Sequence, residues 1–174
     1  MEIPIQIVVT GLTMGSMYAL AAVGLSLIFG TLGMFNMAHG MFMTAGAYVV
    51  FSLAASTGLP MGVAVLVAML AGAVVGVATH LLIVRFMLAD SDFSTNVIVA
   101  TAGLAIVMED VALKIFGGYP YQQAVGVKGT FSLGGVAVSS QSVVILLVAM
   151  ICIGAVAWLL LRTRFGRAIR ATAM

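Results

Sequence analysis

The chain has 174 residues, of which 63% are hydrophobic and only 7% charged, and its formal net charge is +2. Soluble domains carry about 25% charged residues, so this composition excludes a soluble globular protein. Several apolar runs exceed the length of about 18 residues that marks a candidate membrane span. The sequence therefore predicts an integral membrane protein.

Five membrane-spanning helices are predicted along the chain. Backbone groups inside a bilayer must pair within the protein, which leaves only helices or a closed barrel. Barrel strands alternate apolar and polar residues in short segments, whereas the runs here are long and continuous. The predicted fold class is an all-α polytopic helical bundle. We place its helices near residues 5–29, 34–53, 61–86, 94–116 and 142–161.

The basic residues predict the orientation of these helices. Four arginines follow the fifth span, and Lys and Arg are enriched in cytoplasmic loops. The C-terminus is therefore expected in the cytoplasm, and five crossings place the N-terminus in the periplasm. Arg85 then falls inside, as the rule requires. The loop at residues 117–141 falls outside, and its Gly, Ser and Val content allows a small hairpin.

Pairs of glycines within the spans suggest where helices pack. Small residues let helix backbones approach closely in a membrane, most clearly in the G-x-x-x-G spacing. Gly11 with Gly15 and Gly72 with Gly76 have this spacing. We predict that these four glycines are packing sites in a compact bundle.

The sequence shows no arrangement of residues typical of an enzyme active site. We therefore expect neither a catalytic residue nor a metal or cofactor site in this chain. His39 and His80 lie on different predicted helices without a partner at metal-ligand spacing. A phosphate-binding loop needs Gly-Lys followed by Ser or Thr. Lys114 and Lys128 follow Leu and Val instead. Energy for any uphill transport must therefore come from another subunit or from an ion gradient.

Charged side chains occur near the end of the fourth predicted span. Asp110 and Lys114 are four residues apart and can form a modest ion pair. A charged side chain at the centre of a bilayer costs about 2.5–3.5 kcal/mol. Glu109 and Asp110 are therefore expected near the interface, and the alternative is that they line an outer vestibule.

Asn36 and His39 interrupt a stretch without charged residues between Glu2 and Arg85. One reading is that both side chains satisfy backbone groups in a loop between the first two helices. The other is an irregular helix start that lines a path, since irregular backbone at membrane depth must be buried or face water. Physical reasoning alone leaves both open.

The end of the chain forms a short basic amphipathic pattern. On a helical wheel, Arg164, Arg167 and Arg170 share one arc, and Phe165 and Ile169 share another. Anchoring at the cytoplasmic surface, with anionic lipid, explains this pattern. Docking of a cytoplasmic partner through the two apolar side chains explains it equally.

Three segments resemble the permeases of bacterial branched-chain amino-acid ABC importers. The first, residues 24–48, contains the pattern N-x-A-H-G, and the others are residues 101–118 and 163–173. The pattern is read at Asn36, Ala38, His39 and Gly40. The resemblance covers essentially the whole chain and is greatest to the H-type subunit, with the permease of urea importers a near relative.

The resemblance implies a multi-pass protein of the bacterial inner membrane that translocates leucine, isoleucine or valine. Its expected partners are the lipid bilayer, a second similar permease, two cytoplasmic ATPases that bind ATP, and a periplasmic amino-acid-binding protein; no nucleic acid is expected. Residues 162–174 would form a cytoplasmic coupling segment that meets the ATPase, through Arg164, Phe165, Gly166, Arg167, Ile169 and Arg170. Asn36 and His39 would be structural pins of the signature, not substrate ligands.

Family members are longer and have more spans, so we expect residues 1–174 to be a single permease domain that forms the N-terminal part of a longer protein. Two further readings stay open. An ion-driven carrier or channel often has ionisable groups near the midplane of the membrane, and His39 is the one candidate. A non-transporting fragment that only assembles with partners is the third reading.

Overall fold

The predicted membrane-spanning helices are present in the computed structural model, which describes residues 2–88, 92–119, 121, 129–133, 136–164 and 166–167. Within this part of the chain, five helices are long and apolar enough to cross a membrane: Pro4–Leu32, His39–Thr57, Met61–Met87, Phe93–Phe116 and Ser140–Arg162. The all-α polytopic class predicted from composition is therefore confirmed, and each predicted span has its helix.

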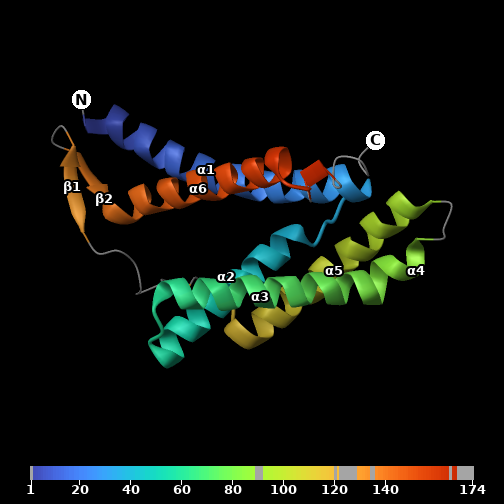
Figure 1. Ribbon diagram of the computed structural model, residues 1–174. Coiled ribbons are helices and arrows are strands. Elements are labelled where there is room, and N and C mark those ends of the chain that lie inside the picture. Colours follow the sequence, from blue (N-terminus) through green and yellow to red (C-terminus); the bar gives the residue numbers. More distant parts are fainter. Residues whose placement is uncertain are drawn as a thin grey trace. The chain divides into compact units, whose positions relative to one another are not determined.

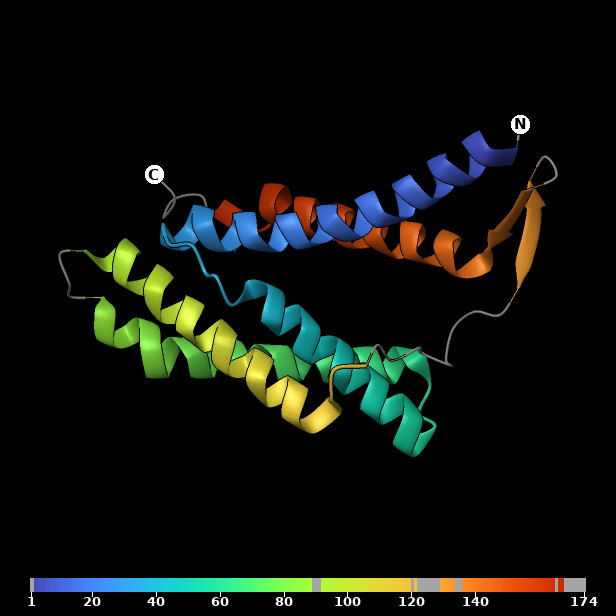
Figure 2. The ribbon, with the colours of Figure 1, turned by 180° about the vertical axis from the view of Figure 1, so that it is seen from behind.

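Figures 1 and 2 show the helices and strands from two opposite sides, coloured along the sequence. The long helices are α1 (Glu2–Leu32), α2 (His39–Thr57), α3 (Met61–Thr79), α5 (Phe93–Phe116) and α6 (Ser140–Arg162). Two short elements, η1 (His80–Val84) and α4 (Arg85–Met87), continue α3. The strands β1 (Thr130–Leu133) and β2 (Val136–Ser139) precede α6.

Both predicted boundaries of the second helix are wrong by about a turn, since residues 34–53 were expected and α2 is His39–Thr57. The second helix was expected from residue 34, but α2 begins at His39 and residues 34–36 are not helical. Gly33 adopts a left-handed backbone with φ 62°, which glycine tolerates without a steric penalty, and its N–H donates to the carbonyl of Phe29. Residues 34–38 then form the connection that leads into α2.

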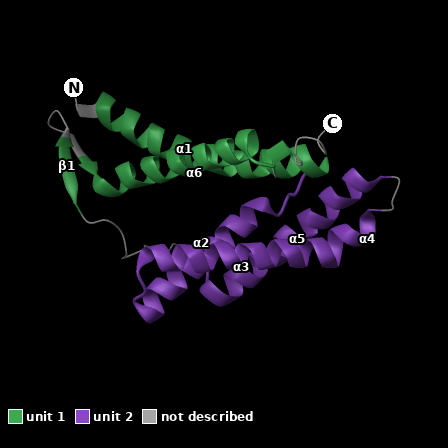
Figure 3. Cartoon of the chain, in the orientation of Figure 1, with its two compact units in different colours: residues 1–33, 126–174 green, residues 34–125 purple. Residues whose placement is uncertain are grey.

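The chain divides into two compact units, residues 1–33 with 126–174 and residues 34–125 (Figure 3). The single domain expected over residues 1–174 stays a prediction. In the first unit α1 and α6 lie side by side (Figures 1 and 2), and β2 contacts α1 before it leads into α6. The strands pair antiparallel with Phe131 opposite Val138, so the loop between the fourth and fifth spans does contain a small hairpin.

The second unit is a bundle of α2, α5 and the long helix formed by α3, η1 and α4. α2 packs chiefly on α3, and α5 contacts both α2 and η1. Small side chains at Ala54, Ala64 and Ala68 are buried and let these helices approach closely. Gly58 ends α2 with a left-handed backbone and Pro60 precedes α3, which makes the tight connection between the two helices.

Candidate functional site

The turn that leads into α2 is organised by the side chain of Asn36. Its Oδ1 accepts a hydrogen bond from the N–H of Ala38 at 2.9 Å, and the side chain is buried. The N–H of His39 donates to the carbonyl of Asn36 at 3.2 Å, which closes the turn on the backbone side. Asn36 therefore satisfies backbone groups between the first two spans, which is the first of the two readings given above.

A buried hydroxyl on α5 holds this turn in place. Thr101 Oγ1 accepts a hydrogen bond from the N–H of Met37 at 3.1 Å and donates to the carbonyl of Val97 at 2.8 Å. Thr101, Val97 and Ala38 are all completely buried. The turn is thus clamped on a helix 64 positions further along the chain. Sequence reasoning missed Thr101, because nothing local distinguishes it from any other threonine in a membrane helix.

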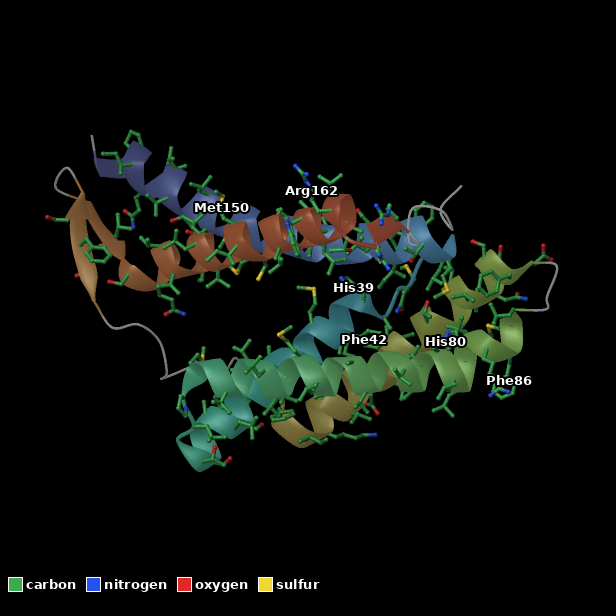
Figure 4. The ribbon with its side chains drawn as sticks, in the orientation of Figure 1. His39, Phe42, His80, Phe86, Met150 and Arg162 are labelled. Carbon is green, nitrogen blue, oxygen red and sulfur yellow. The ribbon has the colours of Figure 1, made fainter. Side chains whose placement is uncertain are left out.

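His39 and Gly40 are the first two residues of α2 and complete the N-x-A-H-G pattern. His39 is half-buried, and Gly40 is exposed with no neighbouring atom that would meet an added Cβ. Figure 4 shows His39 and His80 on different helices, and among the described residues no group of three His, Cys, Asp or Glu could hold a metal ion. A functional role for Asn36, Ala38, His39 and Gly40 as a permease signature stays a prediction.

Three arginines are exposed where α6 ends. Arg162 is the last residue of α6, Thr163 breaks the helix, and Arg164 and Arg167 lie in a new helical segment. All three arginine side chains are exposed, and Gly166 is buried between the last two. The other predicted coupling residues, Phe165, Ile169 and Arg170, lie outside the described residues. The described part of the segment thus presents a basic surface beyond the span.

The charged residues of α5 are exposed near its C-terminal end. Lys114 Nζ lies 2.6 Å from Asp110 Oδ2, so the predicted ion pair is present, with both side chains largely exposed. Such exposed pairs contribute about 0–1 kcal/mol to stability. Glu109 is also exposed, about two turns before α5 ends at Phe116. Both readings of these acids, interface and vestibule, stay open.

The second unit has an apolar groove of about 510 Å³ between α2, α3 and α5. The rings of Tyr48 and Phe116 stack with centroids 3.9 Å apart, and both line the groove. Tyr121 donates its hydroxyl hydrogen to the carbonyl of Phe116 at 2.6 Å, which ties the following loop to this stack. The walls suit an apolar group and bring no set of polar groups together.

The four glycines predicted as packing sites face open space within this chain. An added Cβ at Gly11, Gly15, Gly72 or Gly76 would have no neighbouring atom within 4 Å in the described structure. Close packing at these positions would therefore need another chain or another segment. Their role as packing sites stays a prediction.

Comparison with known proteins identifies one family. Residues 7–174 match the family described as branched-chain amino acid transport system / permease component. The high-affinity branched-chain amino acid transport system permease protein BraD of Pseudomonas aeruginosa is 29% identical over 180 residues, covering 97% of this chain and 59% of the relative. LivH of Escherichia coli K12, with the same description, is 28% identical over 186 residues, covering 97% of this chain and 58% of the relative.

The match to these relatives is partial in length. This chain spans about three fifths of the length of the two relatives named above. A shorter stretch of 52 residues is 42% identical to LivH of Salmonella typhimurium and covers 30% of this chain and 17% of the relative. No solved structure matches the chain.

Proposed function

This chain belongs to the family of permease components of branched-chain amino acid transport systems, and from this membership we propose that it acts as a transmembrane permease subunit of a bacterial ABC importer. The substrates in this proposal are branched-chain amino acids, which the chain translocates across the inner membrane. The family match over residues 7–174 is the observation that carries the proposal. The five helices able to cross a membrane agree with it.

The proposed assembly contains a second homologous permease, two cytoplasmic ATPase subunits and a periplasmic amino-acid-binding protein. ATP would be bound by the ATPase subunits, so the energy for transport enters through a contact between chains. We propose that the segment after α6 makes this contact. Its support is the set of exposed arginines, Arg162, Arg164 and Arg167, which follow directly on a membrane-spanning helix.

Charge reversal in this segment tests the proposal. Arg164→Glu combined with Arg167→Glu is expected to abolish ATP-driven leucine uptake in proteoliposomes that contain the co-expressed partners. The reason is that two positive charges that would attract the ATPase surface become negative charges that repel it. Membrane insertion should be unchanged, since Arg85, Arg162 and Arg170 still favour the cytoplasm on this side. Lys114→Glu is the matched control. It reverses one positive charge, where the double variant reverses two, in an exposed pair on α5, and it should leave uptake within about twofold of wild type.

The possible outcomes separate the proposal from its rivals. Normal ATP-driven uptake by the double variant would show that the coupling assignment is wrong. Uptake by the chain alone, without ATP or partners, would favour an ion-driven carrier or channel. Retention of the ATPases without uptake under any condition would favour a fragment that assembles but does not transport.

A further inference from the structure

Thr163 separates two helical segments of the first unit. α6 ends at Arg162, and Thr163 adopts an extended backbone with φ −97° and ψ 162°. The chain is helical again at Arg164 and at residues 166–167. The segment that carries the exposed arginines is therefore not a simple continuation of α6, and its direction is set at Thr163.

The hydroxyl of Thr163 bonds to both segments. Its Oγ1 donates to the carbonyl of Leu159 at 2.5 Å and accepts from the N–H of Gly166 at 3.1 Å. The first bond gives the carbonyl of Leu159 a second donor at the end of α6, and the second satisfies an N–H at the start of the next segment. One side chain thus bonds to the last turn of α6 and caps the segment that follows.

The backbone of Thr163 reinforces the same joint. Its N–H donates to the carbonyl of Leu159 at 3.2 Å, and its carbonyl accepts from the N–H of Arg167 at 3.2 Å. Thr163 is therefore bonded back to α6 and also caps the segment that follows. A change in the angle between the two segments would have to break at least one of these four bonds.

Gly166 closes the joint by direct contact. It is buried, and a Cβ added to it would collide with the backbone carbonyl oxygens of Leu159 and Leu160 at the end of α6. The new segment therefore lies against the end of α6 at a distance that only glycine permits. Hydrogen bonds at Thr163 and contact at Gly166 together restrict how the new segment can lie against the end of α6.

We propose that Thr163 is a positioning residue that makes a rigid joint between α6 and the arginine-bearing segment. A displacement of that segment by a partner then moves α6 instead of bending the chain at residue 163. This inference rests on the proposed coupling role of the segment, and it assigns to Thr163 a function that the N-x-A-H-G and arginine patterns do not include.

The first experiment measures the joint itself, without reference to transport. Spin labels on the native Cys152 in α6 and on Arg167→Cys report the distance across residue 163 in the full chain in lipid bilayers. A single narrow distance is expected for the chain with Thr163 and for Thr163→Ser, which keeps the hydroxyl. Thr163→Val has a similar shape but no hydroxyl, and its distance distribution should broaden.

The second experiment measures coupling in the assembled transporter, with Arg167 intact. Thr163→Val should lower leucine transported per ATP hydrolysed by about tenfold, since two hydrogen bonds that hold the joint are lost. The amount of ATPase that co-purifies should not change, and Thr163→Ser should restore the wild-type ratio. Gly166→Ala gives a second variant with Thr163 intact, and its added Cβ should likewise lower the ratio.

These readouts distinguish the joint from the function on which it rests. A narrow distance and a wild-type ratio in Thr163→Val would overturn the proposal. Equal loss in Thr163→Val and Thr163→Ser would also overturn it, because the hydroxyl would then not be the cause. A wild-type chain that retains no ATPase would refute the proposed function, and with it the coupling role of the joint, whereas the spin-label distances would still decide the joint's rigidity.

Discussion

The hydroxyl of Thr101 connects α5 to the turn that precedes α2. Thr101 Oγ1 is the acceptor for the N–H of Met37 in the turn before α2, and the threonine itself is completely buried. The bond is part-buried, and an N–H that loses its acceptor in such a place costs up to about 1–3 kcal/mol, because neither lipid nor apolar side chains replace the bond. The conformation of the N-x-A-H-G turn therefore depends on a residue outside the pattern.

Thr101→Val is expected to lower the free energy of unfolding in detergent micelles by about 1–3 kcal/mol, because it replaces the hydroxyl with a methyl group of similar size. Thr95→Val makes the same chemical change at an exposed position of α5 and should change this free energy by less than about 0.5 kcal/mol. Thermal unfolding of both variants measures the difference. Equal stability of the two variants would mean that the clamp contributes nothing.

At the scale of elements, the span Met61–Met87 contains a π-turn at η1. This turn changes which residues of the span share its buried face. The N–H of Arg85 donates to the carbonyl of His80, five residues back, within η1. Thr79 and Val84 are both buried although they are five residues apart. In a regular α-helix residues three or four apart share a face, so the wider π-turn is what brings this pair to the same side.

Deletion of Leu82, which is exposed within η1, should be tolerated. It shortens the bond from Arg85 to His80 to the ordinary spacing of four residues and keeps the helix on either side in its present phase. Deletion of Val74, equally exposed but in regular α3, should rotate everything after it by about 100° and bury the wrong face.

Folded protein recovered in detergent by size-exclusion chromatography measures this difference. We expect a monodisperse peak for the first deletion and aggregation for the second. Similar yields for both deletions would contradict the role given to the π-turn.

Elements that depend on composition were predicted well, and elements that depend on distant contacts were not. The five spans follow from long apolar runs, and the ends of α5 lie within a residue of the prediction. The start of α2 was misplaced, because Asn36 and Thr101 hold residues 34–38 in a turn that no local pattern shows. The same reason hides Thr101. The π-turn and the joint at Thr163 rest on contacts within a few residues, but no residue pattern in the sequence marks them.

On the scale of the whole molecule, the apolar surface is what the chain offers its surroundings. Large side chains such as Leu70, Ile115 and Met150 are each about two thirds exposed or more. In water such surfaces would be covered by folding, so here lipid, other chains or other segments must cover them. Lipid and partner helices are equally apolar, which is why composition predicts a membrane protein without predicting which face meets a second permease.

The orientation of the spans remains a prediction, and cysteine accessibility tests it. In a Cys152→Ser background, Tyr119→Cys follows α5, Phe86→Cys lies at the end of the span before it, and Arg164→Cys follows α6. The arginines at 85, 162, 164 and 167 favour the cytoplasm for the second and third positions. A membrane-impermeant maleimide should therefore modify Tyr119→Cys in intact bacteria, and the other two only after the inner membrane is permeabilised.

The number of crossings gives this experiment an internal control. One span separates residue 86 from residue 119, and another separates residue 119 from residue 164. Phe86→Cys and Arg164→Cys must therefore behave alike, and Tyr119→Cys must behave oppositely, whichever side is inside. The reversed pattern would refute the positive-inside assignment and place the arginine-bearing segment in the periplasm, where no ATPase could reach it. Equal labelling of all three would mean that at least one of these helices does not cross the membrane.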